Sequence, residues 1–141
     1  MTTPVFASLG AADAEATVAL WQAADLTRPW NDPHADFARA ITGAHSAVLG
    51  GRDETGVLVA TIMTGEDGHR GWFYYLAVDP AHRRRGLGRA AVAAAEDWLR
   101  ARAVPKAQLM IRHGNDAAGA FYAALGYESA DVTVVARWLD R

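Results

Sequence analysis

The stretch that decides the fold runs from residue 76 to residue 89 and reads LAVDPAHRRRGLGR. It begins at the apolar end of a β-prone run, passes through a basic loop and reaches two glycines where an amphipathic helix is expected to begin. The first turn of a helix presents unpaired N–H groups and a partial positive charge, and glycines let a ligand approach the backbone. Together with Arg84, Arg85 and Arg89, this pattern predicts a binding site for a diphosphate.

The rest of the chain alternates β-prone runs with helical patterns, which predicts one α/β domain over residues 1–141 with a mixed sheet. The expected helices run from about Ala12 to Asp25, from the turn at Arg28–Pro33 to Thr42, from Leu87 to about Ala103, and from Asn115 to Gly126. The expected strands lie near Pro4–Ser8 and at Ala47–Arg52, Val57–Thr64, Trp72–Val78, Ala107–Ile111 and Asp131–Trp138.

Composition excludes several classes of protein. Apolar residues make up 51% of the chain, but charges interrupt them too often for a membrane span. The N-terminus lacks the basic and apolar regions of a secretory signal, so a cytoplasmic protein is expected. The absence of cysteine excludes disulfides and thiolate chemistry, and the five histidines lack metal-ligand spacing, so no metal is expected. A net charge of -2 provides no general attraction to nucleic acid.

The glycines also fit the loose dinucleotide fingerprint of a Rossmann fold, through Gly86, Gly88 and Ala91. That fold requires the glycines almost directly after its first strand, and an acidic residue about 20 residues later to bind the ribose. Here several strands precede the motif, residues 79–85 separate it from its strand, and the next strand ends in a basic pair, Arg112 and His113. A hydride-transfer enzyme is therefore only a minor alternative.

Two blocks of sequence resemble the GNAT superfamily of N-acetyltransferases. Arg83-x-x-Gly86-x-Gly88 matches the family's Q/R-x-x-G-x-G/A signature, and Asn115 followed seven residues later by Tyr122 is similar to its second conserved block. The resemblance covers roughly the whole chain, and residues 26–33 and 67–71 are similar to a bacterial subgroup that is biochemically poorly defined. It implies a single GNAT domain with a mixed central sheet of about six to seven strands flanked by about four helices.

The resemblance also implies a site for acetyl-CoA as co-substrate. In the family, a strand end pairs with the pantetheine arm, and a bulge in that strand leaves an N–H free for the acetyl oxygen, here near Leu76–Val78. The amides that follow hold the pyrophosphate, and an asparagine contacts the cofactor arm. The corresponding residues are Leu76, Ala77 and Val78 on the strand, Arg84, Arg85, Gly86, Leu87, Gly88 and Arg89 in the loop, and Asn115.

The same resemblance makes Tyr122 the general acid that protonates the departing thiolate, although a core aromatic on an amphipathic helix is the alternative interpretation. The general base is open. Family members often carry a glutamate at positions that here hold Trp72 and Met110, which cannot accept a proton. The nearest candidates by sequence are loop residues that could equally be ordinary surface residues or recognise a cationic acceptor, namely Glu66, Asp67 and His69.

Two functions from different classes follow. The favoured one is transfer of an acetyl group from acetyl-CoA to a primary amine of a small molecule or protein, by direct attack in a ternary complex, in a monomer or homodimer. The other is an acyl-CoA-binding module with weak or lost catalysis that acts as a sensor or binds a partner. Under the first, the acceptor is expected to meet the polar turn that contains Arg28, Trp30, Asn31 and Asp32.

Overall fold

The computed structural model describes residues 3–141, which divide into two compact units on either side of Met110. The first unit contains a five-stranded sheet and three α-helices, and the second contains one α-helix and an extended segment. In chain order the first unit comprises β1 (Ala7–Ser8), the short 3-10 helix η1 (Ala11–Asp13), α1 (Ala14–Ala23), α2 (Pro33–Thr42), β2 (Ser46–Arg52), β3 (Leu58–Glu66), β4 (Gly71–Val78), the short 3-10 helix η2 (Pro80–His82), α3 (Leu87–Arg100) and β5 (Ala107–Leu109), and the second comprises α4 (Asp116–Ala124).

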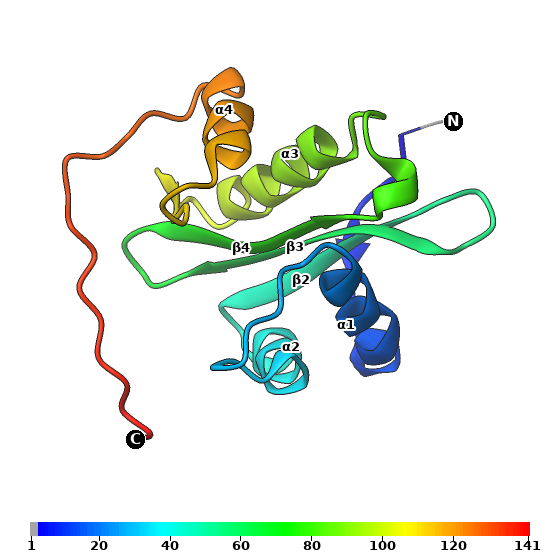
Figure 1. Cartoon of the computed structure of the whole chain (residues 1–141), viewed down its shortest axis with the longest axis horizontal. Coiled ribbons are helices and arrows are strands. Elements are labelled where there is room, and N and C mark those ends of the chain that lie inside the picture. The colour runs from blue at the N-terminus through cyan, green and yellow to red at the C-terminus, as the bar shows by residue number, and fades with distance from the viewer. Residues whose placement is uncertain (1–2) are drawn as a thin grey trace. The chain divides into compact units, whose positions relative to one another are not determined.

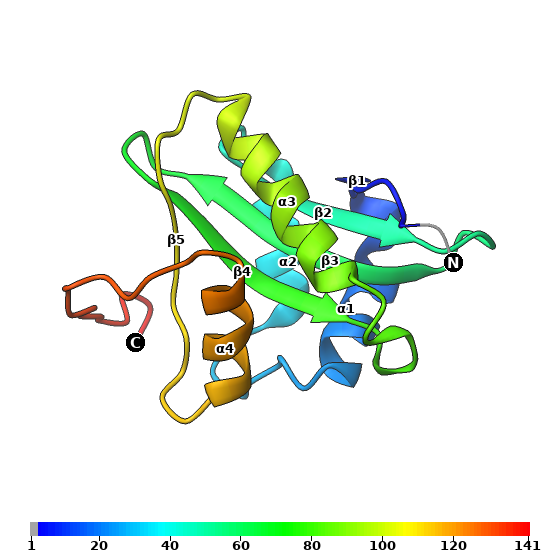
Figure 2. The ribbon, with the colours of Figure 1, turned by 90° about the horizontal axis from the view of Figure 1, so that it is seen from above.

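The sheet of the first unit has the order β1-β2-β3-β4-β5. Its strands are antiparallel up to β4, and β4 pairs with β5 in parallel, so the predicted mixed sheet is confirmed. Helix α3 covers one face of the sheet, and α1 and α2 cover the other (Figures 1 and 2). The sheet is therefore the middle layer of three, which is the usual way to bury both of its faces.

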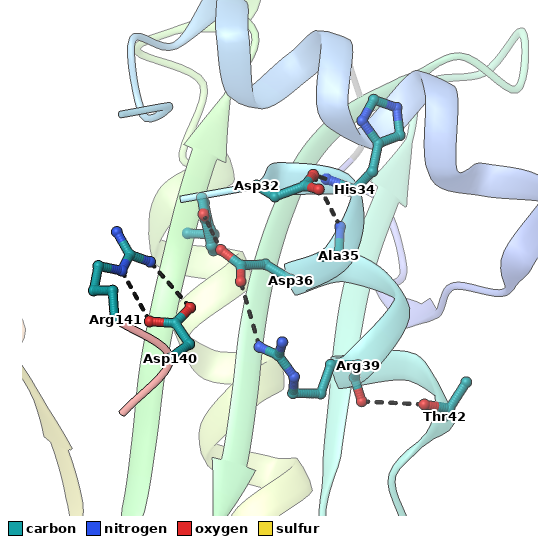
Figure 3. A network of polar contacts seen from close by, with 9 residues as sticks. Asp32, His34, Ala35, Asp36, Arg39, Thr42, Asp140 and Arg141 are labelled. Atoms are coloured by element: carbon teal, nitrogen blue, oxygen red, sulfur yellow. Dashed lines mark hydrogen bonds and ion pairs between the residues drawn. The ribbon is translucent and has the colours of Figure 1, made fainter. Parts of the chain in front are cut away.

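Local sequence explains where the elements begin and turn. The Asp32 carboxylate accepts hydrogen bonds from the backbone N–H groups of His34 at 3.0 Å and Ala35 at 3.2 Å, and Pro33 occupies the first turn of α2 (Figure 3). The β2–β3 hairpin turns at Gly56, whose φ of +88° lies in the left-handed region that glycine adopts most readily.

The core has a part on each face of the sheet. Trp21 of α1 and Phe37 of α2 lie almost fully buried against Val48 of β2. On the opposite face, Gly71 of β4 has no side chain because a Cβ there would collide with Leu99 of α3. The buried stripe of α3 consists of Leu87, Ala91, Val92, Ala95 and Leu99. Ala94 and Trp98 of the same helix are only half-buried beside this stripe.

Two predictions about the sheet are wrong. The segment Asp131–Trp138 does not form a strand, and its residues are exposed. The sheet accordingly has five strands among the described residues, in place of the six to seven expected. A β-prone sequence becomes a strand only when a neighbouring edge offers hydrogen-bond partners, and the unit that contains this segment has no strand to offer.

In the second unit, α4 begins where the sequence predicted. The side chain of Asn115 accepts a hydrogen bond from the N–H of Ala118 at 3.1 Å and so caps the helix. The left-handed Gly126, with φ of +92°, follows the end of the helix. Within residues 3–141, no helix has both the length and the apolar character needed to cross a membrane.

Candidate functional site

Strand β4 contains the bulge that the sequence analysis expected. Thr61 of β3 lies opposite Ala77, whereas Met63 lies opposite Tyr74. One residue of β3, Ile62, therefore faces two residues of β4, Tyr75 and Leu76. A bulge leaves its extra residue outside the regular ladder of hydrogen bonds, and bulges are common beside active sites.

The bulge also changes which face the strand presents to each helix layer. Gly71 faces Leu99 of α3, and in a regular strand Tyr75 and Ala77 would lie on that same face. Instead, both belong to the core under α1 and α2. The extra residue thus reverses the in-and-out alternation halfway along β4.

Beyond the bulge, β4 has an open edge. Its pairing with β5 covers only Gly71–Phe73, so Tyr74–Val78 pair with β3 on one side and have no strand on the other within the described chain. An open strand edge offers backbone N–H and C=O groups for pairing with an extended ligand. The predicted cofactor residues Leu76, Ala77 and Val78 lie along this edge.

The basic loop lies directly after this edge. Two of its residues, separated by a single residue, have a left-handed backbone: Arg84 has φ of +66° and Gly86 has φ of +76°. A Cβ at Gly86 would meet nothing within 4 Å, so this glycine serves backbone conformation and access and not internal packing. No side chain caps α3, which leaves the N–H groups of its first turn available to a ligand.

The arginines of this loop point outward. Arg83, Arg84, Arg85 and Arg89 are exposed, and no ion pair within the described residues holds Arg83, Arg84 or Arg89. The predicted residues of the loop, from Arg84 to Arg89, therefore combine exposed cations with the uncapped end of a helix. This combination suits a negatively charged ligand of high charge density.

The other two predicted cofactor-side residues lie in the second unit. Asn115 caps α4 with its side-chain oxygen, and its backbone carbonyl accepts from Gly119 N–H at 3.2 Å. Tyr122 is 8% exposed and packs edge-on against the rings of Phe121 and Tyr127. Burial raises the pKa of the Tyr122 phenol to about 12, so it keeps its proton at neutral pH.

The three candidate bases lie where β3 ends and the loop to β4 begins, and the carboxylates of two of them are engaged with other groups of the protein. His45 Nδ1 lies 2.6 Å from one oxygen of Glu66, and the N–H of Gly68 donates to the other at 2.8 Å. These two hydrogen bonds lower the pKa of Glu66, the His45 contact more strongly. A lowered pKa makes a carboxylate a weaker proton acceptor.

The Asp67 carboxylate accepts three hydrogen bonds, one more than the carboxylate of Glu66. One oxygen of Asp67 accepts the backbone N–H groups of Arg70 at 2.7 Å and His69 at 2.9 Å, and the other accepts the indole N–H of Trp72 at 3.3 Å. The backbone bonds from Arg70 and then His69 lower the pKa of this carboxyl. The His69 ring contacts only the guanidinium of Arg70, at 3.5 Å, among the side chains of the described residues.

A hollow of about 390 Å³ lies beside this loop, within the first unit. The rings of Trp72 and Tyr74 contribute to its wall, as do the acidic residues Glu66 and Asp67. Burial and the charge of Asp67 raise the pKa of the Tyr74 phenol. The remaining lining residues are Arg39, Gly43, Ala44, His45, Ser46 and Gly65. Aromatic faces beside carboxylates suit the binding of a cation.

The polar turn between α1 and α2 is largely held by its own backbone. Arg28 donates to the carbonyl oxygens of Asp25 at 2.9 Å and Thr27 at 2.8 Å, and its own carbonyl accepts from Asn31 N–H at 3.1 Å. Asp32 is the cap of α2, and Trp30 is 42% exposed. Among the four predicted acceptor residues, Trp30 therefore presents a partly exposed aromatic ring.

The sequence interpretation missed Tyr75, one of the two residues of the bulge, and its partner Asp36. The hydroxyl of Tyr75 donates to Asp36 Oδ2 of α2 at 2.7 Å, and its ring stacks on Trp21 of α1. The available signal was the pair of adjacent tyrosines at 74 and 75, which interrupts the alternation of the strand. The positions where family members often have a glutamate hold Trp72, which donates to Asp67, and Met110, which is 50% exposed.

Comparison with known proteins agrees with this geometry. A model of the acetyltransferase (GNAT) family matches residues 15–127. An acetyltransferase of Pectobacterium atrosepticum is 41% identical over 127 residues, which cover 90% of this chain and 89% of that protein. The ribosomal-protein-S18-alanine N-acetyltransferase of Escherichia coli is 30% identical, with a TM-score of 0.78, over 91% of this chain and 79% of that chain. The aminoglycoside N-acetyltransferase AAC(6′)-Iy in complex with CoA shares the fold, with 16% identity and a TM-score of 0.81, over 96% of this chain and 94% of that chain.

Proposed function

The chain belongs to the GNAT family of acetyl-CoA-dependent acetyltransferases, and from this premise we propose that it transfers the acetyl group directly to a primary amine of a small molecule or a protein. Acetyl-CoA, when bound, supplies the acetyl group as a thioester. The observation that carries the proposal is the open edge of β4, bulged at Tyr75–Leu76 and followed by a basic loop that leads into α3.

Three parts of the chain hold the co-substrate in this proposal. The open edge at Leu76–Val78 pairs with the pantetheine arm as an added strand would. The N–H groups at the start of α3 and the exposed arginines bind the pyrophosphate. Asn115 contributes a contact to the arm, in keeping with its match to the family's second block.

The bulge provides the electrostatic part of catalysis. An N–H left outside the strand ladder at Tyr75–Leu76 donates to the acetyl oxygen, and it stabilises the negative charge that develops there as the amine attacks. A donor fixed in place before the reaction is more effective than water, because it does not have to reorganise. The same N–H orients the carbonyl carbon toward the incoming nitrogen.

Proton transfer needs an acid and a base. Tyr122 gives its proton to the departing sulfur, because its phenol, whose pKa burial raises, is protonated at neutral pH. Glu66, Asp67 and His69 remain the candidates for the base. The hydrogen bonds that lower the pKa of both carboxylates favour His69, acting directly or through a water, as the group that takes the proton from the amine.

The acceptor is proposed to be cationic before it reacts. The hollow beside Trp72 and Tyr74 places aromatic faces next to the carboxylates of Glu66 and Asp67, which suits an ammonium group. The exposed ring of Trp30 and its neighbours Arg28, Asn31 and Asp32 in the α1–α2 turn provide a second acceptor contact. Two similar proteins are named as amine acetyltransferases, one for the alanine of a ribosomal protein and one for aminoglycosides. Both a protein and a small molecule should therefore be tested as acceptors.

The test is release of free thiol from acetyl-CoA in the presence of single amines, polyamines, amino acids and peptides. Turnover that depends on one class of amine, with the acetylated amine identified by mass spectrometry, would support the proposal. Gly86→Asp serves as the matched negative control, because it puts a negative charge beside the pyrophosphate.

A second candidate function has its own support. If the chain is an acyl-CoA-binding module with weak or lost catalysis, the engaged carboxylates of Glu66 and Asp67 and the apolar residues Trp72 and Met110 are explained without a base. Calorimetry that shows acetyl-CoA binding, combined with no thiol release for any amine of the panel, would favour this function over transfer.

A further inference from the structure

Tyr75 occupies an unusual backbone position at the centre of the site. Its φ of +52° lies in the left-handed region, which bulky side chains rarely adopt. A glycine would take this conformation with little strain. A tyrosine stays there only when its side chain gains enough from its surroundings, so its contacts must hold the bulge.

Two contacts hold the Tyr75 side chain, a ring stack on Trp21 of α1 and a hydrogen bond to Asp36 of α2, and together they form the Tyr75 clamp. The ring stacks on Trp21 with centroids 3.9 Å apart and planes 11° from parallel. Trp21 is fully buried, and its indole N–H donates to Thr61 Oγ1 at 3.1 Å. Thr61 is the β3 residue that faces Ala77, immediately past the bulge, so Trp21 links the bulge residue Tyr75 to the neighbouring strand.

The hydroxyl of Tyr75 is clamped on the side of α2. It donates to Asp36 Oδ2 at 2.7 Å. The other oxygen of Asp36 lies 3.6 Å from the guanidinium of Arg39, a pair that Figure 3 labels. The Asp36 side chain is 24% exposed, so this charge-assisted hydrogen bond is partly shielded from water. Asp32 caps the same helix, which fixes the turn that carries Asp36.

We propose that Tyr75 is a positioning residue for acetyl transfer: its stack on Trp21 and its hydrogen bond to Asp36 set the direction of the bulge N–H that binds the acetyl oxygen. This inference rests on the proposed function. Tyr75 itself does not touch the reacting atoms. It acts because a donor displaced by a fraction of an ångström loses much of its effect on the transition state.

The test separates the hydroxyl from the ring. Tyr75→Phe keeps the stack on Trp21 and removes only the bond to Asp36. We expect kcat to fall about 10- to 100-fold, with the KM for acetyl-CoA within about twofold of wild type, because binding along the open edge is retained. Asp36→Ala should fall to a similar level, and the double variant should be no worse than either single one, because both remove the same hydrogen bond. Asp36→Asn keeps an oxygen acceptor and should recover most of the rate.

A spectroscopic readout isolates the position of the donor from general stability. Difference infrared spectra of bound acetyl-CoA, labelled with carbon-13 at the carbonyl, report the hydrogen bond to the acetyl oxygen as a lowered stretching frequency. In Tyr75→Phe the frequency should move back toward that of free acetyl-CoA. Val92→Ala is the matched control, since it removes part of a buried side chain of α3, on the face of the sheet opposite Trp21 and Asp36, and it should keep the wild-type kcat and frequency.

The outcomes distinguish this inference from the proposed function. If wild type releases thiol with an amine but Tyr75→Phe keeps both its kcat and the carbonyl frequency, the positioning role is wrong and the transfer stands. If wild type binds acetyl-CoA without lowering the carbonyl frequency, the positioning role is wrong as well. If wild type lowers the frequency but no amine is acetylated, the frequency of Tyr75→Phe still decides the positioning role, whereas the transfer fails.

Discussion

The two loops on either side of β4 use their polar groups in opposite ways. In the loop of residues 66–70, before the strand, the Glu66 and Asp67 carboxylates accept hydrogen bonds from neighbouring N–H groups and from the His45 ring. In the loop of residues 79–86, after the strand, Arg83 and Arg84 are exposed with no ion pair among the described residues, and the helix that follows has no side-chain cap. The carboxylates of the first loop are occupied by groups of the protein, whereas the second loop leaves the guanidinium groups of Arg83 and Arg84 for a ligand. Charged residues in a loop therefore indicate a binding site only when the fold leaves them without internal partners.

The largest effect on turnover is expected at Tyr122, which lies in neither loop and is proposed as the general acid. Tyr122→Phe should lower turnover about 10²–10⁴-fold and leave the affinity for acetyl-CoA and the melting temperature nearly unchanged, because only the hydroxyl is lost. Stopped-flow measurement of thiol release, under conditions where chemistry limits the rate, tests this. Phe121→Leu, a packing change on the same helix, is the control. Wild-type turnover in Tyr122→Phe would return this residue to the role of a core aromatic.

The second-largest effect is expected on the affinity for acetyl-CoA, and it should distinguish two glycines that both have a positive φ. Gly86 and Gly68 both have positive φ, at +76° and +85°, and a Cβ at either would meet nothing within 4 Å. Gly86→Asp should weaken acetyl-CoA binding about 100-fold, because it adds a negative charge beside the pyrophosphate. Gly68→Asp carries the same backbone strain in the other loop and should change the affinity little. Calorimetry on both folded variants decides, and equal losses would remove the distinction between the loops.

A moderate effect is expected from single arginines of the second loop. Arg84→Gln and Arg89→Gln should each weaken acetyl-CoA binding about 3- to 10-fold and make the affinity less dependent on salt, because each removes one exposed charge from the anion site. Dissociation constants measured at several sodium chloride concentrations check this. Arg100→Gln, at the far end of α3, is the control and should match wild type. An unchanged salt dependence in both loop variants would contradict a role for these charges.

The smallest effect on rate should come from Glu66→Gln, below about twofold, because its carboxylate is engaged within the protein. Glu66→Gln should instead lower the stability of the folded protein, by an amount that depends on pH. The folded protein lowers the pKa of Glu66 from the ordinary value of 4.5, so the stabilisation is present above that pH and is lost as the pH falls through the lower, folded pKa.

Melting temperatures of wild type and Glu66→Gln, measured from pH 7 down to pH 3, test this linkage. The variant should melt lower at pH 7, and the two curves should converge in acid. A gap that widened as the pH fell, or a large loss of turnover at saturating acceptor, would reassign Glu66 to the chemistry of the site.

Much of the fold could be predicted because local rules decide it. Asp32 and Pro33 at the start of α2, and Asn115 at the start of α4, cap helices through contacts only two or three residues away. The strand before the basic loop, the loop itself and the helix that begins at its glycines were predicted for the same reason. The strand predicted at Asp131–Trp138 was wrong, since β-propensity expresses itself only on a neighbouring edge and none lies in that unit.

The sequence by itself therefore determined the order of the elements up to α4, the position of the basic loop and the resemblance to the family, because each depends on residues close together in the chain. Tertiary structure alone decided which charges are available and how β4 is bent. The bonds that occupy Glu66 come in part from His45, which is 21 residues away, and the clamp on Tyr75 joins it to Asp36 across 39 residues. Contacts of that range are set by packing between layers, which no local pattern encodes.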